Sequence, residues 1–181
     1  MGYDTTTAAA TAAARMALLE EFFLEQPINS RPGNSRRATA TTPSAPVNLG
    51  TVDHIRRSVY DLEQHTRAAA PDAGPLPARP SAAYDWVMQH TEHAPETVQR
   101  RRDVLIYKQQ LEHAIRLGET GVVRRHRCPG CGTVGLHWRA GSVRCRNRRC
   151  RTPDGLGSTW TLSQIATQYI ADQEKRRRRA T

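Results

Sequence analysis

Residues 128–150 read CPGCGTVGLHWRAGSVRCRNRRC and contain all four cysteines of the 181-residue chain. Two close cysteine pairs joined by a short segment are typical of a tetrahedral site in which four thiolates bind one metal ion. The intervening segment, 132–144, is long enough for a two-stranded hairpin that brings the pairs together. The spacing therefore predicts one Zn²⁺ per chain, with Cys128, Cys131, Cys145 and Cys150 as its ligands.

Other readings of the cysteines are weighed by their chemistry. An iron site of the rubredoxin type has the same ligand set, and spacing alone does not separate it from zinc. Two disulfides need an oxidising compartment, whereas the N-terminus MGYDTTTAAATAAAR has no secretory signal. A redox motif at Cys128 and Cys131 should open a helix in a βαβ unit, but Gly132 follows at once. His126 and His137 flank the site and are expected at the surface or beside the ligands.

Basic residues are concentrated in the last third of the chain. The 27 Lys and Arg exceed the 17 Asp and Glu, for a formal net charge of +10. Residues 1–120 carry 13 basic and 14 acidic side chains, whereas residues 121–181 carry 14 basic and 3 acidic ones. A general preference for Arg over Lys does not explain why acidic residues thin out after residue 120. A dense positive field on a small surface attracts polyanions, above all nucleic acid.

We expect the arginines around the cysteines and in the C-terminal run to contact nucleic acid, DNA rather than RNA. Guanidinium groups match phosphate oxygens well, and Asn147 is a candidate for reaching a base edge. The predicted contact residues are Arg124, Arg125, Arg127, Arg144, Arg146, Asn147, Arg148, Arg149, Arg151, Arg176, Arg177, Arg178 and Arg179.

The chain before the cysteines predicts helices separated by proline-rich breaks. Apolar residues recur at spacings of three and four, as on one face of a helix. We expect an Ala-rich helix over 5–26, a flexible linker over 27–47 and a helical domain over 48–118. That domain should contain helices over 48–70, 81–94 and 95–117, with Ser81 as an N-cap. The apolar end of the first helix needs a partner, either the next helices or another chain, so a homo-oligomer or a protein partner is possible.

Residues 121–173 are expected to form the metal module. A strand over 122–127 should lead into a hairpin over 134–139 and 143–145, and Trp138 should cover the metal site or pack on the following helix. Thr161 and Gln164 match a capping box, S/T-x-x-Q. The helix that it starts should pack against the hairpin and end in a basic tail over 174–181. The predicted fold class is mainly α with a small β zinc ribbon.

The CPGCG turn, the hairpin and the second cysteine pair resemble a zinc ribbon, over about residues 122–151. The second pair departs from the commoner two-residue gap, because four residues separate Cys145 from Cys150. The wider layout resembles small proteins of actinomycete phages, with a Pro46-Val47-Asn48 entry, a Trp-containing helix, a long helix and a ribbon ending in Trp160. Those proteins are of unassigned function, so the resemblance implies a phage or prophage origin rather than an activity.

The sequence predicts a binding protein rather than an enzyme. It has no phosphate-binding Gly-rich loop, no H-E-x-x-H and no nucleophile elbow, and four thiolates leave a metal no open position. No apolar run approaches the ~20 residues of a membrane span, and we expect a cytoplasmic protein in a bacterial host. The leading interpretation is an accessory or regulatory nucleic-acid-binding protein. The alternative is an adaptor for host transcription or replication machinery, with a purely structural zinc.

Overall fold

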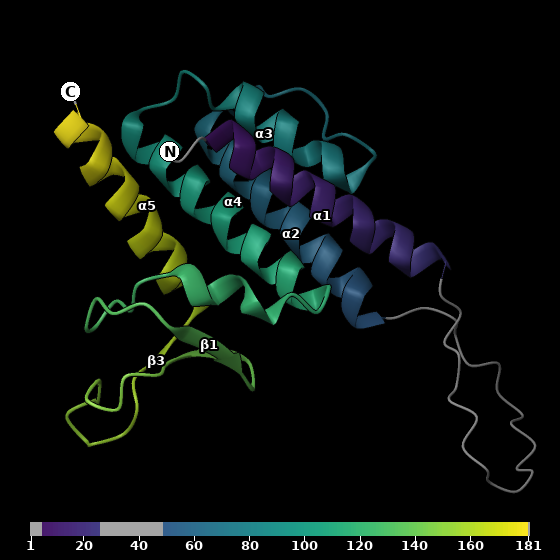
Figure 1. Ribbon diagram of the computed structural model, residues 1–181. Helices are drawn as coiled ribbons and strands as arrows, with labels where there is room; N and C mark the ends of the chain where they lie inside the picture. Colours follow the sequence, from purple (N-terminus) through teal and green to yellow (C-terminus); the bar gives the residue numbers. More distant parts are fainter. Residues whose placement is uncertain (1–4, 26–48, 181) are drawn as a thin grey trace, which may run out of the picture.

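The predicted helices are present at nearly the expected positions. A computed structural model describes residues 5–25 and 49–180, so the predicted linker over 27–47 lies outside the described residues. Four helices precede the cysteine-containing module and pack side by side (Figure 1): α1 (Thr5–Glu25), α2 (Leu49–Ala69), α3 (Ala83–His90) and α4 (Glu96–Arg116). The prediction of a mainly helical chain is confirmed.

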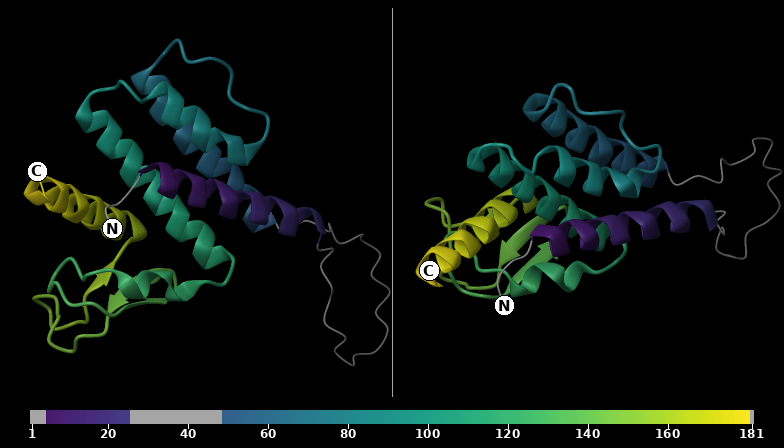
Figure 2. Two further views of the ribbon diagram at one scale, coloured as in Figure 1. Left: turned by 45° about the horizontal axis from the view of Figure 1, so that its top comes forward. Right: turned by 90° about the horizontal axis from the view of Figure 1, so that it is seen from above.

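Small side chains on one face of α1 bring it against the other helices. The buried residues of this face are Ala8, Ala9, Ala12, Met16 and Leu19. They recur at helical spacing, and alanine lets two helix backbones approach closely. α1 packs mainly on α4 and on α3 (Figure 2). The buried face of α1 is therefore covered by helices of the same chain, whereas Leu18 near its apolar end is 50% exposed.

The start of α3 differs from the prediction. A short 3-10 helix, η1 (Pro80–Ala82), precedes α3, and Ala82 occupies the N-cap position without a side-chain cap. Ser81 instead donates its backbone N–H to Glu20 Oε1 on α1, at 2.9 Å. Pro80 favours this tight turn because its ring fixes φ. The capping role predicted for Ser81 is wrong. The Glu20 carboxylate of α1 instead fixes the position of this segment.

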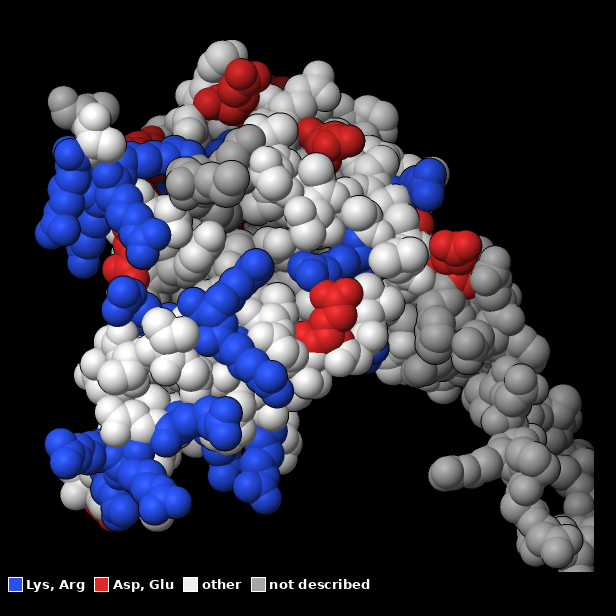
Figure 3. Space-filling view, viewed as in Figure 1, with Lys and Arg blue, Asp and Glu red and all other residues white. Residues whose placement is uncertain are grey.

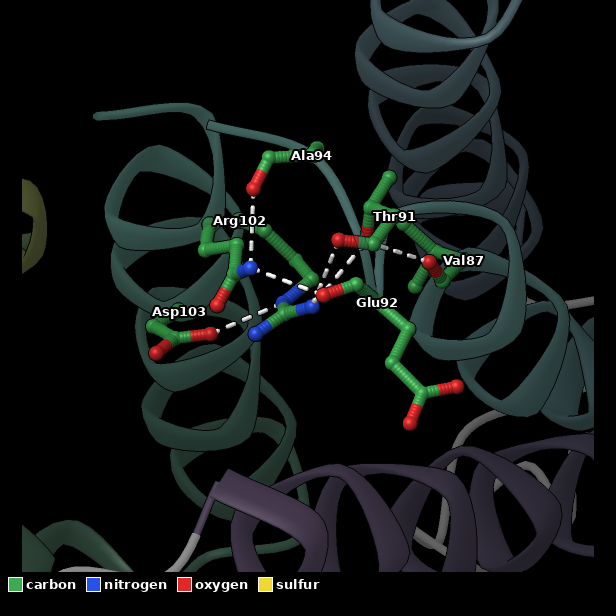
Figure 4. Close-up of polar contacts among 7 residues, drawn as sticks. Val87, Thr91, Glu92, Ala94, Arg102 and Asp103 are labelled. Atoms are coloured by element: carbon green, nitrogen blue, oxygen red, sulfur yellow. Dashed lines mark hydrogen bonds and ion pairs between the residues drawn. The ribbon is translucent and has the colours of Figure 1, made fainter. Parts of the chain in front are cut away.

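A buried arginine fastens the turn between α3 and α4. Arg102 is 5% exposed; its Nη1 donates to Thr91 Oγ1 at 3.1 Å and its Nε to Asp103 Oδ1 at 2.8 Å. Figure 4 shows its guanidinium reaching from α4 to the end of α3. The side-chain amide of Gln99 on α4 donates to the Glu92 carbonyl at 2.8 Å. Carbonyls beyond a helix end lack intrahelical donors, so these side chains satisfy them.

The last helix, α5 (Leu162–Ala180), begins with the predicted capping box. Gln164 donates its N–H to Thr161 Oγ1 at 3.2 Å, and Thr161 donates its N–H to Gln164 Oε1 at 2.8 Å. Two backbone donors that the helix cannot satisfy are paired in this way. α5 runs along α4 (Figure 1), and its principal contacts are with that helix rather than with the hairpin against which the sequence predicts it to pack. Its buried apolar residues are Leu162, Ile165, Ala166 and Ile170.

The cysteine-containing module is a small antiparallel sheet with strand order β1-β2-β3. Its strands are β1 (Leu136–Arg139), β2 (Ser142–Cys145) and β3 (Thr159–Trp160). Arg139 pairs with Ser142, which leaves a two-residue turn of Ala140 and Gly141 with φ of 47° and 79°. Positive φ at both positions is the mark of a type I′ hairpin turn. The predicted hairpin is confirmed, and β3 adds a third strand that the sequence analysis does not include.

The segment before the first cysteine is helical rather than extended. A 3-10 helix, η2 (Thr120–Arg125), occupies most of the predicted strand over 122–127, and only Arg127 forms a β-bridge, with Val134. The turn places Val123 in the core and leaves Arg124 and Arg125 exposed. The predicted strand is wrong. Apolar and polar residues alternate only weakly in this segment, and the helical turn buries Val123 instead.

One apolar core joins the helices to the sheet. Leu136 of β1, Val143 of β2 and Val123 of η2 belong to the same buried cluster as Leu62 and Leu111 of the helices. The division into a helical domain over 48–118 and a module over 121–173 stays a prediction about independent folding. Over residues 5–25 and 49–180, no helix combines the length and the apolar character that crossing a membrane requires.

Candidate metal centre and basic surface

The four cysteine sulfurs converge on one point. The Sγ atoms of Cys128 and Cys150 are 3.6 Å apart, those of Cys131 and Cys145 are 3.7 Å apart, and all four lie within 4.8 Å of one another. A tetrahedral ion with metal–sulfur bonds of about 2.3 Å has sulfur–sulfur edges of about 3.8 Å. The cluster therefore fits a tetrahedral metal ion, and it is the one such group found among the described residues.

The first cysteine pair sits on a tight turn, and its two thiols form no disulfide bond. Gly132 donates its N–H to the Cys128 carbonyl at 2.8 Å, and Cys128 donates its N–H to the Thr133 carbonyl at 2.9 Å. Gly132 has φ of 71°, which glycine adopts readily. No helix starts here, so the geometry does not match a redox motif. All four cysteines are free thiols, with sulfurs well beyond the disulfide bond length of about 2.05 Å.

Trp160 closes one side of the centre. A Cβ atom added to Gly130 would lie 3.0 Å from Trp160 Cζ2 and 3.6 Å from Cys150 Sγ. The indole therefore lies against the first cysteine turn, and only glycine fits there without displacing it. Trp138, Trp160 and Leu162 at the start of α5 line one hollow. Trp160 is the tryptophan that lies against the cysteine cluster, and the position of Trp138 over the site or on the helix stays a prediction.

Asn147 organises the longer gap of the second pair. Its backbone N–H lies 3.4 Å from Cys145 Sγ, and its Oδ1 accepts the Arg149 N–H at 3.0 Å. Its carbonyl accepts the Cys150 N–H at 2.9 Å, and its Nδ2 lies 3.7 Å from Cys131 Sγ. The side chain predicted to reach a base edge is thus engaged within the cysteine turn. Its contact with nucleic acid stays a prediction.

Hydrogen bonding and burial shift the pKa values of the cysteine thiols in opposite directions. A hydrogen bond with the Thr133 hydroxyl, at 3.0 Å, lowers the pKa of the Cys131 thiol to about 6. Burial raises the pKa of Cys145. Thiolates this close repel one another, so they cannot all ionise without a cation. A metal ion removes that conflict and releases protons as it binds.

Neither flanking histidine is a ligand. His126 is 3% exposed; its Nδ1 donates to the Val123 carbonyl at 3.1 Å, so its Nε2 accepts from the Tyr107 hydroxyl at 2.8 Å. Both nitrogens are occupied, and burial lowers the pKa of His126 to about 4. His137 lies on β1, and its Nδ1 is buried without a partner among the described residues. His126 is therefore buried beside the site rather than at the surface.

Lys and Arg gather on the side of the molecule that carries the sheet and the end of α5, where acidic side chains are sparse (Figure 3). The eight arginines nearest the cysteines are all exposed. None of them forms an ion pair with a carboxylate of the described residues. These eight are Arg124, Arg125, Arg127, Arg144, Arg146, Arg148, Arg149 and Arg151. Their charge is therefore available to an external anion.

Some of the predicted contact residues also brace the loops. Arg151 donates from Nε to the Arg148 carbonyl and from Nη1 to the Gly155 carbonyl, both at 3.1 Å. Arg127 donates from Nη1 to the Gly132 carbonyl at 3.1 Å. A guanidinium has five N–H donors, so each retains donors for a phosphate.

The C-terminal arginines lie on a helix. α5 continues to Ala180, so the predicted basic tail is helical over the residues described. Successive residues of a helix are turned by about 100°, so Arg177 and Arg178 point away from Arg176, whereas Arg179, three residues on, shares a face with Arg176. Arg178 Nη2 lies 3.5 Å from Glu96 Oε1. These four arginines therefore do not form one face.

The most buried polar network lies in the helices and is not predicted from the sequence. His54 on α2 lies 2.8 Å from His113 Nδ1 on α4, and His113 Nε2 lies 2.6 Å from the Tyr84 hydroxyl on α3. Tyr84 donates to Gln109 Oε1 at 2.7 Å, and Gln109 donates to the Ser58 carbonyl at 2.9 Å. Because the Tyr84 proton goes to Gln109, His113 donates from Nε2 and accepts at Nδ1 from His54. One directional chain of hydrogen bonds therefore joins three helices.

Comparison of this chain with protein-family models, with curated proteins and with solved structures finds no match.

Proposed function

We propose that this chain is a zinc-ribbon protein that binds nucleic acid, DNA in the first instance, through its C-terminal third. The observation that carries the proposal is the coincidence of two features. Four sulfurs spaced for a tetrahedral ion lie among eight exposed arginines without acidic partners in the described chain. A rigid, positively charged module of this kind suits phosphate binding.

Zinc is the metal that the site suits best. Four-thiolate sites that close small modules hold Zn²⁺ most often, and iron with the same ligands is the alternative. Four protein ligands leave no open position for substrate, so we propose a structural role for the ion and no enzymatic activity. Free thiols suit a reducing cytosol. A phage or prophage origin rests on the resemblance of the layout alone.

The arginines are proposed to contact phosphates rather than bases. Phosphate contacts position a protein on DNA without specifying sequence. Their binding releases counterions, so the logarithm of the binding constant falls linearly with the logarithm of salt concentration. If about five arginines reach phosphates of a duplex, the slope is about −4 to −5.

The experiment is fluorescence anisotropy of the zinc-loaded protein with duplexes of unrelated sequence over a salt series. The Arg146→Glu/Arg149→Glu variant should weaken binding to each sequence to a similar extent. Ser142→Ala is the control and should bind as the wild type does; it removes, from the neighbouring hairpin, a hydroxyl that donates to the Arg139 carbonyl at 3.1 Å. Absence of a complex at micromolar protein and ~150 mM salt would contradict the proposal.

A second function is favoured by apolar exposure beside the basic surface. Val134 is 61% exposed and Leu156 is 69% exposed, and both flank the cysteine turns. Interfaces between proteins combine arginine with apolar side chains in this way. Under this alternative the chain is an adaptor that meets an acidic protein surface of host transcription or replication machinery. Leu156→Ser would then abolish capture of that protein and leave DNA binding unchanged.

A further inference from the structure

We propose that one single strand of nucleic acid lies in a groove between α5 and the segment that leads into the first cysteine turn. This inference rests on the proposed function and assigns it a location and a form of substrate. The groove has a volume of ≈ 320 Å³, and both of its walls carry arginine. The residues that decide its chemistry are Arg125, Arg127, Gln168, Tyr169, Asp172 and Arg176. We call it the α5 groove.

The charge of the α5 groove is set from two sides. Arg125 at the end of η2 and Arg127 just after it line one wall, and Arg176 lines the α5 wall. All three are exposed, and none is paired with a carboxylate in the described chain. The single acid, Asp172, accepts a hydrogen bond from the Gln168 amide at 3.0 Å. Three guanidiniums against one carboxylate leave the groove positive, as an anionic backbone requires.

The floor of the groove is rigid and aromatic. Tyr169 of α5 stacks on Tyr107 of α4, with ring centroids 4.2 Å apart and planes 7° from parallel. Tyr107 is fixed in turn by its hydrogen bond with the buried His126. Burial raises the pKa of the Tyr107 hydroxyl, and the adjacent Arg125 guanidinium opposes that rise in part. A pre-formed floor spares a ligand the cost of ordering it.

The composition of the groove favours one strand over two. Proteins that bind single strands combine a positively charged groove along the backbone with aromatic side chains for the bases. The α5 groove, with a volume of ≈ 320 Å³, has both features, three arginines and the ring of Tyr169. Arg146 and Arg149 instead lie exposed on the loop between the last two cysteines, where a duplex can approach.

The test compares two variants of equal charge on two substrates. Arg125→Ala/Arg176→Ala removes one arginine from each wall of the groove and leaves Arg127, and Arg146→Ala/Arg149→Ala removes the same charge from the cysteine loop. Each zinc-loaded variant is titrated by anisotropy against a labelled oligothymidylate and against a duplex of equal length, at about 150 mM salt. Metal content and near-UV circular dichroism verify the fold. Arg125→Gln/Arg176→Gln serves as a second groove variant that keeps polar side chains.

The groove variant should lose about tenfold in affinity for the single strand, and the salt slope should fall from about −2 to about −0.7, as expected when one of three phosphate contacts remains. The loop variant should lose less than about threefold on the single strand and more on the duplex. Equal losses by both variants on both substrates would overturn the α5 groove and leave nucleic-acid binding intact. A wild-type protein that prefers the duplex would overturn the single-strand assignment. A wild-type protein that binds neither would overturn the proposed function and the groove together.

Discussion

The helices and the cysteine module are held together by different means. α1, α2 and α4 are each 21 residues long and bury stripes of apolar side chains around a polar network. The strands of the module are four, four and two residues long, and its buried sheet residues are Leu136 and Val143. The module thus lacks a large core of its own, and four sulfurs occupy its centre. A metal ion takes the place of apolar burial when a module is this small.

The largest effect is expected from removing one metal ligand. Cys150→Ser should abolish stoichiometric zinc binding and unfold the sheet, because structural Zn²⁺ binds with about 10–16 kcal/mol of apparent free energy. α4 should stay helical, since its core contacts include α1 and α2. Metal analysis measures the loss of zinc. Hydrogen exchange of β1, β2 and α4 measures whether the sheet unfolds while α4 stays helical. A well-folded sheet without metal would contradict the view that a metal ion takes the place of a core in this module. Iron in the wild-type protein would contradict the choice of zinc.

The next largest effect is expected from removing a core side chain of the helices. Leu111→Ala removes a fully buried side chain of α4 and should lower the free energy of unfolding by about 2–5 kcal/mol. The zinc stoichiometry should stay at one per chain. Urea unfolding followed by circular dichroism measures the loss. Leu49→Ala at a 66% exposed position is the control and should change stability by less than about 0.5 kcal/mol. Loss of zinc from Leu111→Ala would show that the two regions are one unit.

Acid should destabilise the helices through the buried histidines. Burial lowers the pKa of His54 to about 4, and burial together with the nearby His54 lowers that of His113 to about 3. Both are neutral in the folded chain, so below their unfolded pKa of about 6.5 the unfolded chain binds more protons. Stability is therefore complete above pH ~6.5 and falls as the pH drops toward 4 and 3, by up to about 1.4 kcal/mol per pH unit for the buried His113 and by less for the partly exposed His54.

Urea midpoints between pH 7 and pH 4.5 measure this dependence. His54→Gln should make it shallower, and His93→Gln, at an exposed position, should leave it unchanged. A dependence that His54→Gln does not alter would place the acid sensitivity elsewhere in the molecule.

The smallest effect tests the contact between Trp160 and the first cysteine turn. Gly130→Ala places a Cβ atom 3.0 Å from the indole, and overpacking of this kind costs about 1–3 kcal/mol. Zinc affinity, measured by competition with a chelator, should fall, and the tryptophan emission should shift. Gly157→Ala is the matched control in the same module, because its added Cβ meets nothing within 4 Å. Equal zinc affinities in the two variants would show that the contact of Trp160 with the first cysteine turn does not support metal binding.

Local signals in the sequence predict much of this structure. The spacing of the cysteines predicts their convergence, Thr161 and Gln164 predict the start of α5, and Ala140-Gly141 predicts the hairpin turn. In each of these, residues close in the chain make the deciding contacts.

The missed features depend on residues far apart in the chain. Ser81 does not cap α3 because Glu20 accepts its N–H. β3 forms because Trp160 pairs with Val143, and two residues have no periodic pattern of their own. Gln109 and His113 lie four residues apart on α4 and are fully buried, so their spacing is the one signal that indicates a polar stripe in the core. Their hydrogen-bond partners, Tyr84 and His54, lie on other helices. From α4 alone, the same spacing predicts a solvent-exposed face.

The stacking of Tyr169 on Tyr107 has a consequence for biosynthesis. Tyr107 leaves the ribosome well before the ring that covers it, and in the interval its α4 face has no α5 to pack against. Chains fold from the N-terminus as they emerge, so the helices assemble first with one side uncovered. Until α5 follows, the uncovered α4 face is a target for chaperones and proteases.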